Sequence, residues 1–599
     1  MLRKTFINEE NLLLLEILQD SKTEYLTGLY INICILIYFK KICILISFSI
    51  YPLLFRMKFF SKLLLAAAMI ILIKFLVFRE DKIQVPKATY PFQMCSDQSQ
   101  KEAHSSKTAP VPDALNRRID EIYNQIDKSI PKIKLENFDE ATSAGESKAT
   151  IVNQKDGYCL GEQLFVRVQA YDYLGNMKSY GGDYLRARIF SPKTNSSASG
   201  NITDYNNGTY LIAFTLFWEG EVTATVLLMH PSEAVSALWR ARNQGFANIL
   251  YTGNFTSATK YVNRECGFQL ETQEDICQYA DRRDQEAFYC IKPPDFPCEA
   301  LTHMNSVNRD HSYLSEVEKL LLNRSNIGVE ISKDFKTISV SSCGKTLIPP
   351  TKSCNRGFYY PIPSGYFSHN IWNPVHCKMN LFNENEKLKR FLKGKKVFLI
   401  GDSTVRQYIR HFAESMKFLD YFNHTEDEMQ SWQKTLLAIN LENFIFVQWK
   451  KHTFPFVSKT FYSIKEDAYM ARQIDQIGGG INTIIILTMG QHFRPFNFRI
   501  FIKAAFNVRR AIERLFIRSP HTKVIIKEEN ARDMDIDMER FSDFHGHIQY
   551  HVLREIFHGL NVGFVDALDM TIAYACNVIH PPVEVLENII SMSFTQATD

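Results

Sequence analysis

The sequence predicts an α/β chain with an all-β domain in front: an immunoglobulin-like β-sandwich, then a doubly wound parallel-sheet domain, behind an N-terminal membrane segment. Three observations predict this class. Apolar residues alternate with period two over 151–265, short β-branched runs alternate with helical patterns over 391–599, and an apolar run dominates 57–80. The 599 residues are enough for several hydrophobic cores.

The composition is that of a folded protein. Hydrophobic residues make up 45% of the chain and charged residues 22%, which excludes a disordered chain, a collagen and a small disulfide scaffold. Lysine and arginine number 69 against 65 acidic residues, so the net charge of +4 provides no basic field for a nucleic acid. We therefore expect no nucleic-acid partner.

The N-terminal region predicts a membrane anchor. Residues 1–56 form a partly apolar extension that Lys40 and Lys41 interrupt, so its pieces fall short of the roughly 20 residues of a spanning helix. Residues 57–80 have the pattern of a complete signal-anchor beginning at Met57, with the positive charges in front of the apolar run. The positive-inside rule then predicts a single-pass type II protein. A cleaved signal peptide and secretion is the alternative, and translation from Met1 or from Met57 stays open.

Sequons and cysteines indicate that the rest of the chain lies in the secretory pathway lumen (ER or Golgi) or outside the cell. Sequons for N-glycosylation begin at Asn195, Asn201, Asn207, Asn254, Asn323 and Asn423. The cysteines beyond the anchor predict disulfides in such an oxidising compartment, and their pairing stays open. They are Cys95, Cys159, Cys266, Cys277, Cys290, Cys298, Cys343, Cys354, Cys377 and Cys576.

Three regions precede the last domain. Residues 81–150 predict a polar stalk with one short helix, in which apolar residues recur at helical spacing from Leu115 to Ile130. Residues 151–265 predict the sandwich, with a hairpin of strands 210–218 and 221–229 joined at Gly220. Residues 266–390 predict an irregular connector pinned by disulfides.

The last domain, residues 391–599, predicts a parallel sheet with helices on both faces. Its clearest helical pattern covers residues 501–518. The strand-like runs are Lys396–Ile400, Phe444–Val447, Thr483–Leu487, Lys523–Ile526 and Val562–Val565.

Gly401, Asp402 and Ser403 follow the first of these strands and open a helix. This is the edge at which doubly wound sheets bind ligands. A serine at a helix start has an exposed hydroxyl, and its own N–H can stabilise an oxyanion. The alternative is structural, because aspartate and serine are favoured N-caps and glycine closes a tight turn.

Two more polar clusters are predicted at the same edge. His580 follows the fifth strand and is the candidate base for Ser403; the alternative is a loop histidine in front of a helix. Gly490, with Gln491 or His492, follows the third strand and is the candidate second oxyanion donor; the alternative is an ordinary polar loop.

These residues carry a family resemblance. Gly-Asp-Ser-Thr-Val-Arg406 with a late histidine resembles the PC-esterase branch of the SGNH hydrolases, a branch that includes O-acetyltransferases acting on sialic acids and plant polysaccharides. Residues 110–595 resemble the neurexophilin and PC-esterase domain (NXPE) family, which implies a neurexophilin-like sandwich followed by an SGNH-like domain. The matching segments are Gly-Gly-Asp-Tyr-Leu-Arg-Ala-Arg188, Asn-Asn-Gly-Thr-Tyr210, Phe-Thr-Leu-Phe-Trp-Glu-Gly220, Ser-Ala-Leu-Trp-Arg-Ala-Arg242 and Gly-Gln-His-Phe-Arg-Pro495.

The sequence departs from the SGNH pattern at one position. The pattern is Asp-x-x-His, whereas Asn577 stands three residues before His580. An asparagine can hydrogen-bond an imidazole but adds no charge beside an imidazolium, so a weakened or inactive site is the alternative. Asp566 and Asp569, at the end of the fifth strand, are candidate replacements for the missing carboxylate.

The sequence therefore predicts a lumenal O-acyl transferase or esterase, by resemblance O-acetyl, acting on glycans or glycoproteins. Ser403 is the nucleophile and His580 the base, while Arg406 anchors the loop or faces an anionic group. We expect no tightly bound cofactor and no metal, since His547 and His551 lack a third ligand for zinc; acetyl-CoA is the candidate acyl donor. The alternative is a non-catalytic extracellular ligand with a degenerate esterase domain, which binds a protein partner through its sandwich.

Overall fold

The structure is a computed structural model that describes residues 111–245, 248–257, 260–422, 435–465, 468–532 and 534–598, and two short strands nearer the N-terminus. The chain divides into two compact units, residues 1–106 and 107–599. In the first unit, β1 (Ile35–Phe39) pairs antiparallel with β2 (Ile42–Ile46). The predicted signal-anchor at 57–80 and the sequon at Asn423 lie outside the described residues. Among the helices that the structure describes, we find none that is both long and apolar enough to span a bilayer.

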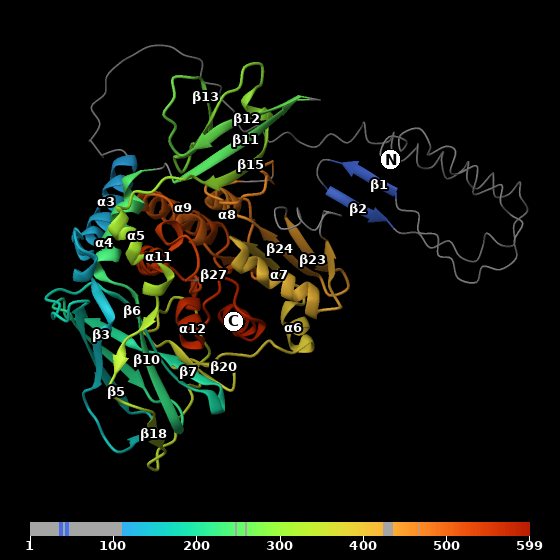
Figure 1. Cartoon of the computed structure of the whole chain (residues 1–599). Helices are drawn as coiled ribbons and strands as arrows, with labels where there is room; N and C mark the ends of the chain where they lie inside the picture. The colour runs from blue at the N-terminus through green and yellow to red at the C-terminus, as the bar shows by residue number, and fades with distance from the viewer. Residues whose placement is uncertain are drawn as a thin grey trace, which may run out of the picture. The chain divides into compact units, whose positions relative to one another are not determined.

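Two mainly antiparallel sheets share one apolar core in the second unit (Figure 1). Every second residue of the central strands is buried, as in Leu164, Val166 and Val168, because side chains alternate between the two faces of a strand. The first sheet has the order β17 (Ser332–Lys333), β3 (Thr142–Ile151), β5 (Gln163–Asp172), β9 (Thr209–Thr215), β8 (Asn201–Asp204). The second has the order β20 (Ile371–Pro374), β19 (Gly365–Ser368), β7 (Ser196–Ser199), β6 (Tyr184–Ser191), β10 (Gly220–His230), β18 (Ile338–Ser341), β4 (Tyr158–Cys159), with β16 (Val329–Glu330) beside β10.

The predicted hairpin between β9 and β10 is wrong. β9 pairs with β5 and β8 in one sheet, whereas β10 pairs with β6 in the other. The segment between them crosses the core, and Leu216 is bonded there through its backbone to Gly161 and Glu162. A strand pair that crosses between sheets buries alternate residues in the same way as a hairpin, so the sequence pattern does not distinguish the two.

Residues 266–390, predicted as an irregular connector, contribute strands to both sheets of the β domain and to a third, separate sheet. Strands from residues 329–374 complete the two-sheet domain, and the disulfide between Cys159 and Cys343 joins its ends. A separate sheet has the order β13 (Ile276–Asp281), β14 (Glu286–Ile291), β12 (Lys260–Gly267), β11 (Ile249–Ser257), β15 (Leu301–Asn308), β25 (Tyr462–Ser463). The other described disulfides pair Cys266 with Cys290, Cys277 with Cys298 and Cys354 with Cys377, and the Cys576 side chain is buried.

The predicted parallel sheet is present, and its strands match the predicted runs within two or three residues. Two antiparallel strands extend it at one edge. The described order is β22 (Asp420–Phe422), β23 (Leu436–Asn440), β24 (Ile445–Lys450), β21 (Lys396–Ile400), β26 (Thr483–Leu487), β27 (Lys523–Lys527), β28 (Gly563–Val565).

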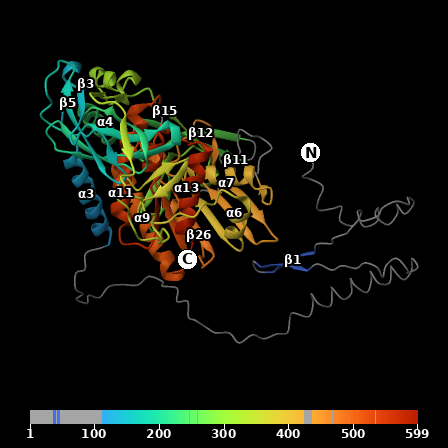
Figure 2. The same cartoon turned by 90° about the horizontal axis from the view of Figure 1, so that it is seen from below.

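Helices cover both faces of this sheet (Figure 2). Ile485 and Leu487 of β26 face one apolar core, and Ile484 and Ile486 face the other. The first core includes α4 (Ser232–Gln244), α8 (Met470–Asp475), α9 (Phe498–Arg518) and α11 (Asp543–Phe557). The second includes α6 (Asn385–Leu392), α7 (Ser403–Ser415), α12 (Ala567–Tyr574) and α13 (Val583–Gln596). The short helices α5 (Glu316–Leu321) and α10 (Met538–Phe541) lie in connecting segments.

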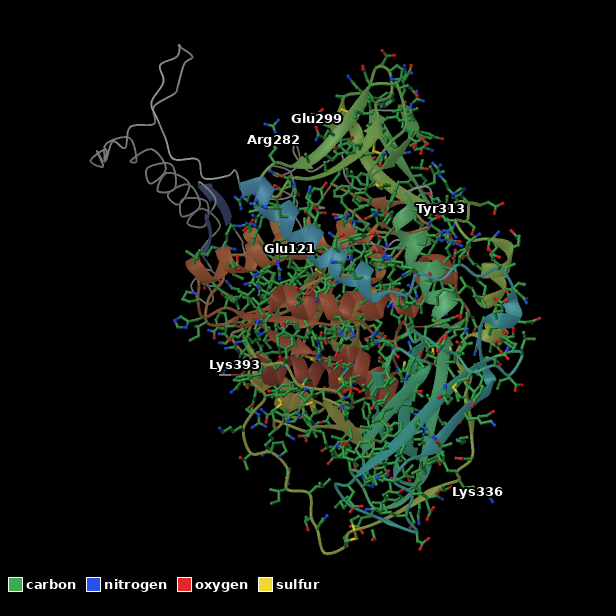
Figure 3. All side chains as sticks on the ribbon, turned by 90° about the vertical axis from the view of Figure 1, so that its left-hand side faces the viewer. Glu121, Arg282, Glu299, Tyr313, Lys336 and Lys393 are labelled. Carbon is green, nitrogen blue, oxygen red and sulfur yellow. A yellow bond between two sulfur atoms is a disulfide. The ribbon has the colours of Figure 1, made fainter. Side chains whose placement is uncertain are left out.

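The helix predicted in the stalk is part of the folded body. It is α3 (Val111–Ser129), and Figure 3 shows it, with Glu121 labelled, lying across the helices of the α/β domain. Ile119 and Ile122 join the first core, and the indole N–H of Trp239 donates to Asp127 Oδ1 at 2.7 Å. The apolar stripe thus packs on α9 instead of forming a free stalk.

Candidate active site

The carboxyl ends of the parallel strands bring the predicted residues to one edge. Ile400 of β21 is in register with Leu487 of β26. Ser403 and Gly490 are each the third residue beyond this pair, so the register places them on neighbouring strand ends.

The turn between β21 and α7 requires glycine at its first position. Gly401 has a φ of +151°, and a Cβ there would lie 2.6 Å from the carbonyl oxygen of Thr488. Asp402 then caps α7, since its Oδ1 accepts from the Thr404 N–H at 2.8 Å and from the Thr404 hydroxyl at 2.7 Å. Ser403 is the first helical residue, so its N–H has no acceptor within the helix.

Ser403 and His580 meet, although 177 residues separate them in the sequence. The distance between His580 Nε2 and Ser403 Oγ is 2.7 Å. Ser403 is half-buried and His580 is exposed, so a substrate can approach the pair from solvent. This is the nucleophile–base geometry that the sequence predicts.

The loop that carries His580 is fixed through its backbone on both sides. The Asn530 Nδ2 donates to the carbonyl of Ile579 at 2.9 Å, and the Gln407 Nε2 donates to the carbonyl of Pro581 at 3.3 Å. One anchor comes from the segment after β27 and the other from α7 itself. The imidazole is therefore positioned by the peptide groups that flank it.

Buried polar side chains connect the turn that carries Ser403 to the loop that carries His580. The Lys527 Nζ donates to the Thr404 hydroxyl at 3.2 Å and to Asn530 Oδ1 at 2.7 Å. Burial lowers the pKa of Lys527 to about 8, partly offset by Asp402 and two neighbouring glutamates. Burial works to raise the pKa of Asp402, but its surroundings, which include the Lys527 cation and the hydrogen bond from Thr404, bring it below its usual value. Asp402 thus stays ionised under the helix start.

Sequence reasoning missed Lys527 and Asn530. The signal was present, since Lys-Glu-Glu-Asn530 directly follows the fourth predicted strand and stands at the same sheet edge as the other clusters.

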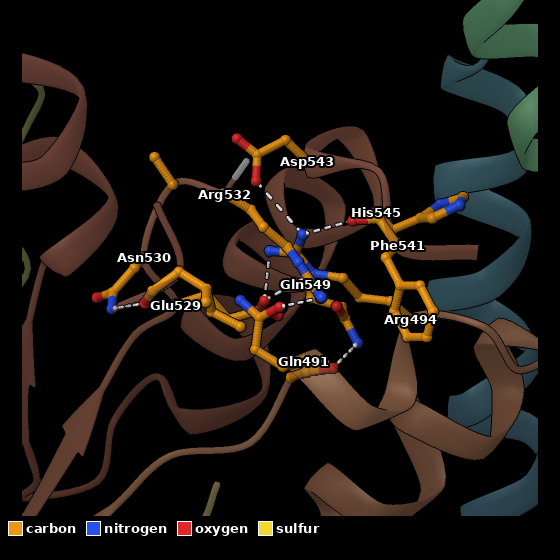
Figure 4. A network of polar contacts seen from close by, with 12 residues as sticks. Gln491, Arg494, Glu529, Asn530, Arg532, Phe541, Asp543, His545 and Gln549 are labelled. Atoms are coloured by element: carbon orange, nitrogen blue, oxygen red, sulfur yellow. Dashed lines mark hydrogen bonds and ion pairs between the residues drawn. The ribbon is translucent and has the colours of Figure 1, made fainter. Parts of the chain in front are cut away.

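The Gly490 loop is built around a buried ion pair (Figure 4). A Cβ on Gly490 would lie 2.0 Å from Glu529 Oε1, so only glycine fits against that carboxylate. Glu529 in turn accepts from fully buried Arg494, whose Nε and Nη2 lie 2.8 and 2.6 Å from Oε2. Breaking a buried pair of this kind costs about 3–5 kcal/mol, so this anchor keeps the loop in place.

The two neighbours of Gly490 face different partners. Gln491 Oε1 accepts from the Arg532 Nη1 at 2.7 Å, which leaves its amide NH₂ as the donor end. His492 Nδ1 accepts from the Val457 N–H at 3.1 Å, so the ring proton resides on Nε2. Burial, and then the neighbouring His452, lowers the pKa of His492 to about 3, which keeps the ring neutral.

Arg406 lies one turn into α7 and is mostly buried. Its guanidinium carbon lies 5.6 Å from the ring centroid of Trp449, the penultimate residue of β24. Burial lowers the pKa of Arg406 to about 10, so the side chain remains a cation at neutral pH. This places a positive charge under the turn that carries Ser403.

The three candidates for orienting His580 differ in their burial and in their hydrogen-bond partners. Asn577 is exposed, and no hydrogen bond joins its side chain to His580 in the described part of the chain. Asp566 accepts from the Tyr550 hydroxyl at 2.8 Å and from the Arg554 Nη2 at 2.6 Å. Asp569 accepts from the Ser199 hydroxyl, and from the N–H and hydroxyl of Ser364 at 2.7 Å each.

The histidine pair and the sequons lie away from the Ser403 edge in the sequence, and the structure describes the surroundings of most of them. His547 and His551 lie with their Nε2 atoms 3.2 Å apart, and no third His, Cys, Asp or Glu side chain completes a metal-binding group among the side chains that the structure describes. Of the sequons, Asn195, Asn201, Asn207 and Asn323 are exposed and Asn254 is half-buried.

The fold and the site define a class: a two-sheet β domain packed on an α/β domain that carries a Ser–His pair at the carboxyl edge of its parallel sheet. Comparison with protein families finds two matches along the chain. Residues 163–317 match the neurexophilin family, and residues 372–597 match the family described as NXPE family member 4-like, C-terminal domain. Together the two matches cover more than half of the chain, and the chain belongs to the NXPE family.

Solved structures give only remote similarities. The Lin-41 filamin domain is 25% identical, with 15% of this chain and 82% of that chain covered and a TM-score of 0.13. FdeC, an adhesin of Escherichia coli, is 13% identical, with 34% of this chain and 66% of that chain covered and a TM-score of 0.13. At these TM-scores neither similarity carries an argument about fold or function.

Proposed function

We propose that this protein is a lumenal serine-dependent O-acyl transferase, or esterase, acting on glycans or glycoproteins, with acetyl as the acyl group. The observation that carries the proposal is the 2.7 Å contact between His580 Nε2 and Ser403 Oγ. The acetyl group and the glycan acceptor rest on the resemblance to the PC-esterase branch.

The proposed chemistry proceeds in two steps. Ser403 Oγ attacks the acyl carbonyl of a donor such as acetyl-CoA, His580 takes the hydroxyl proton, and the N–H groups of Ser403 and Gly490 stabilise the oxyanion. The C–S bond of the donor then breaks, and the thiolate leaves with the proton from His580. In the second step His580 removes the proton of an acceptor hydroxyl, whose oxygen attacks the acyl carbon. The bond between that carbon and Ser403 Oγ then breaks, and Oγ takes the proton back from His580. Attack by water in place of the acceptor gives hydrolysis.

The surroundings of Ser403 support an acyl-enzyme. Lys527 and Arg406 place positive charge beneath the helix start, and the first turn of α7 directs its own N–H groups toward the same place. Both effects favour negative charge developing on an acyl oxygen. The Arg494–Glu529 pair packs against Gly490, which supports a preorganised second oxyanion donor on this proposal.

The test is labelling of the full chain with a fluorophosphonate probe, followed by mapping of the adduct. We expect a single adduct on Ser403 that is lost in Ser403→Ala and strongly slowed in His580→Ala. Ser415→Ala, at the other end of α7, is the matched control and should label like the wild type. In cells, glycan O-acetylation should exceed the empty-vector level with the wild type only; equal acetylation with Ser403→Ala would exclude Ser403 as the nucleophile.

Two observations favour the second candidate, a non-catalytic extracellular ligand. Asn577 provides no charge for His580, and residues 163–317 match the neurexophilin family. On this proposal the β domain binds a protein partner and the α/β domain is a scaffold. Its test is binding of a cell-surface partner that Ser403→Ala leaves unchanged, in a protein whose wild type does not react with the probe.

A further inference from the structure

A cavity of about 300 Å³ lies between the two-sheet domain and the α/β domain. One wall is formed by β6, β7 and β8, and the other by α11 and α12. Tyr184, His547, Leu568, Ile572 and the rim residues Asn201 and His551 line it. Its volume is at the lower end of the range of small-molecule sites, roughly 300–1,000 Å³.

Asn201 lies at this cavity, at the place where the chain passes from β7 to β8. The Ser199 hydroxyl donates to Asp569 on α12, so Ser199 faces the α/β domain. A Cβ on Gly200 would point the other way, 2.5 Å from the Phe214 ring in the sandwich core. Asn201, the first residue of β8, is among the residues that line the cavity, and it is exposed.

The cavity has the chemistry of a sugar site. The rings of Tyr184 and His547 lie 4.9 Å apart and provide flat faces for the C–H side of a pyranose. The Tyr184 hydroxyl is buried and has no hydrogen-bond partner among the described residues. His547 and His551, which burial keeps neutral by lowering their pKa values, add ring nitrogens that can donate or accept. Hydroxyl and acetamide groups of a sugar can satisfy such atoms.

We propose that the core N-acetylglucosamine of an N-glycan on Asn201 occupies this cavity and joins the two domains. The sequon Asn201-Ile-Thr203 places the attachment point at the rim, and a covalent tether gives the sugar a high effective concentration there. The inference rests on lumenal exposure of the body and is independent of the proposed activity.

Asn207 provides the matched control. It is a sequon asparagine in the turn between β8 and β9, it is exposed, and it does not line the cavity. The full chain, purified from a secretory host, is treated with peptide-N-glycosidase under native conditions, and each site is followed by glycopeptide mass spectrometry. We expect the glycosidase to remove the glycan from Asn201 at least about tenfold more slowly than from Asn207, because the Asn201 glycan must first dissociate from the cavity. After denaturation the two rates should be equal.

Equal native rates, or an unglycosylated Asn201, would overturn the proposal. The Ile572→Trp substitution fills the cavity. It should raise the rate of glycan removal from Asn201 under native conditions to the rate at Asn207. An unchanged rate at Asn201 would also overturn the proposal. Thr203→Ala removes the glycan whereas Thr203→Ser keeps the sequon. We expect a lower melting temperature for the alanine variant than for the serine variant, and equal melting temperatures would exclude a glycan that joins the domains.

Discussion

At the residue scale, His580 contacts Ser403 through its Nε2 atom. The aspartate of the Asp-x-x-His pattern is absent, and Asn577 stands at that position. Because Asn577 is exposed, a carboxylate there would act on His580 through water of high dielectric. We therefore predict that Asn577→Asp raises kcat/KM for probe acylation by at most about tenfold, the order of an exposed charge pair at 1 kcal/mol. The measurement is the pH dependence of kcat/KM for both proteins.

The control for Asn577→Asp is Asn561→Asp, which adds the same charge at an exposed asparagine in front of β28. A gain of a hundredfold or more with Asn577→Asp alone would contradict the prediction, since it would mean that Asn577 occupies the position of a buried triad carboxylate.

At the scale of elements, the segment after β27 anchors the loop that carries His580. Asn530 is fully buried, and its amide joins Lys527 to the carbonyl of Ile579. We predict that Asn530→Ala lowers the limiting rate of Ser403 acylation about 10–100-fold with little change in probe affinity, because a loosened loop misplaces the imidazole without altering the binding surface. Rate against probe concentration separates the two quantities.

Asn385→Ala is the matched control for Asn530→Ala. Asn385 in α6 also donates from its side-chain amide to a backbone carbonyl, that of Ser415, at 3.0 Å. It should leave acylation unchanged. Assays well below the melting temperature of each variant exclude unfolding as the cause, and an unchanged limiting rate in folded Asn530→Ala would exclude the positioning role.

The elements also show how far the sequence could predict this site. Each parallel strand is a short apolar, β-branched run, so it can be recognised in the sequence. The carboxyl ends of parallel strands lie at one edge of the sheet. The sequence alone therefore places Ser403, Gly490 and His580 near one another. β9 and β10 could not be assigned to separate sheets, since both place alternate residues in one core. The partners of Asp569 could not be predicted either, because Ser199 and Ser364 approach it from segments hundreds of residues away.

At the scale of the whole molecule, Asp569 is a buried carboxylate at the junction between the two domains. It accepts from Ser199 of β7 and from Ser364, so it joins α12 to the two-sheet domain. Burial, followed by the charge of Asp566, raises the pKa of Asp569 to about 6, above the roughly 3.9 of an unfolded chain. The folded state therefore holds the proton more tightly than the unfolded state does.

This difference predicts how the stability of the junction depends on pH. Below about pH 4 the Asp569 carboxyl is protonated in both states and its favourable contribution is complete; as the pH rises to about 6 the unfolded chain ionises first and that contribution is lost. Asp569→Asn does not titrate, and its amide can still accept from the Ser364 N–H and donate to the Ser199 hydroxyl. We predict that the free energy of unfolding of Asp569→Asn, relative to wild type, increases between pH 4 and 6 and is constant above that range. Urea denaturation at a series of pH values measures it, with Asp420→Asn on the exposed edge strand β22 as the control for the same charge change. A difference that is independent of pH would mean that Asp569 ionises alike in both states, and the proton at this junction would then contribute nothing to holding the domains together.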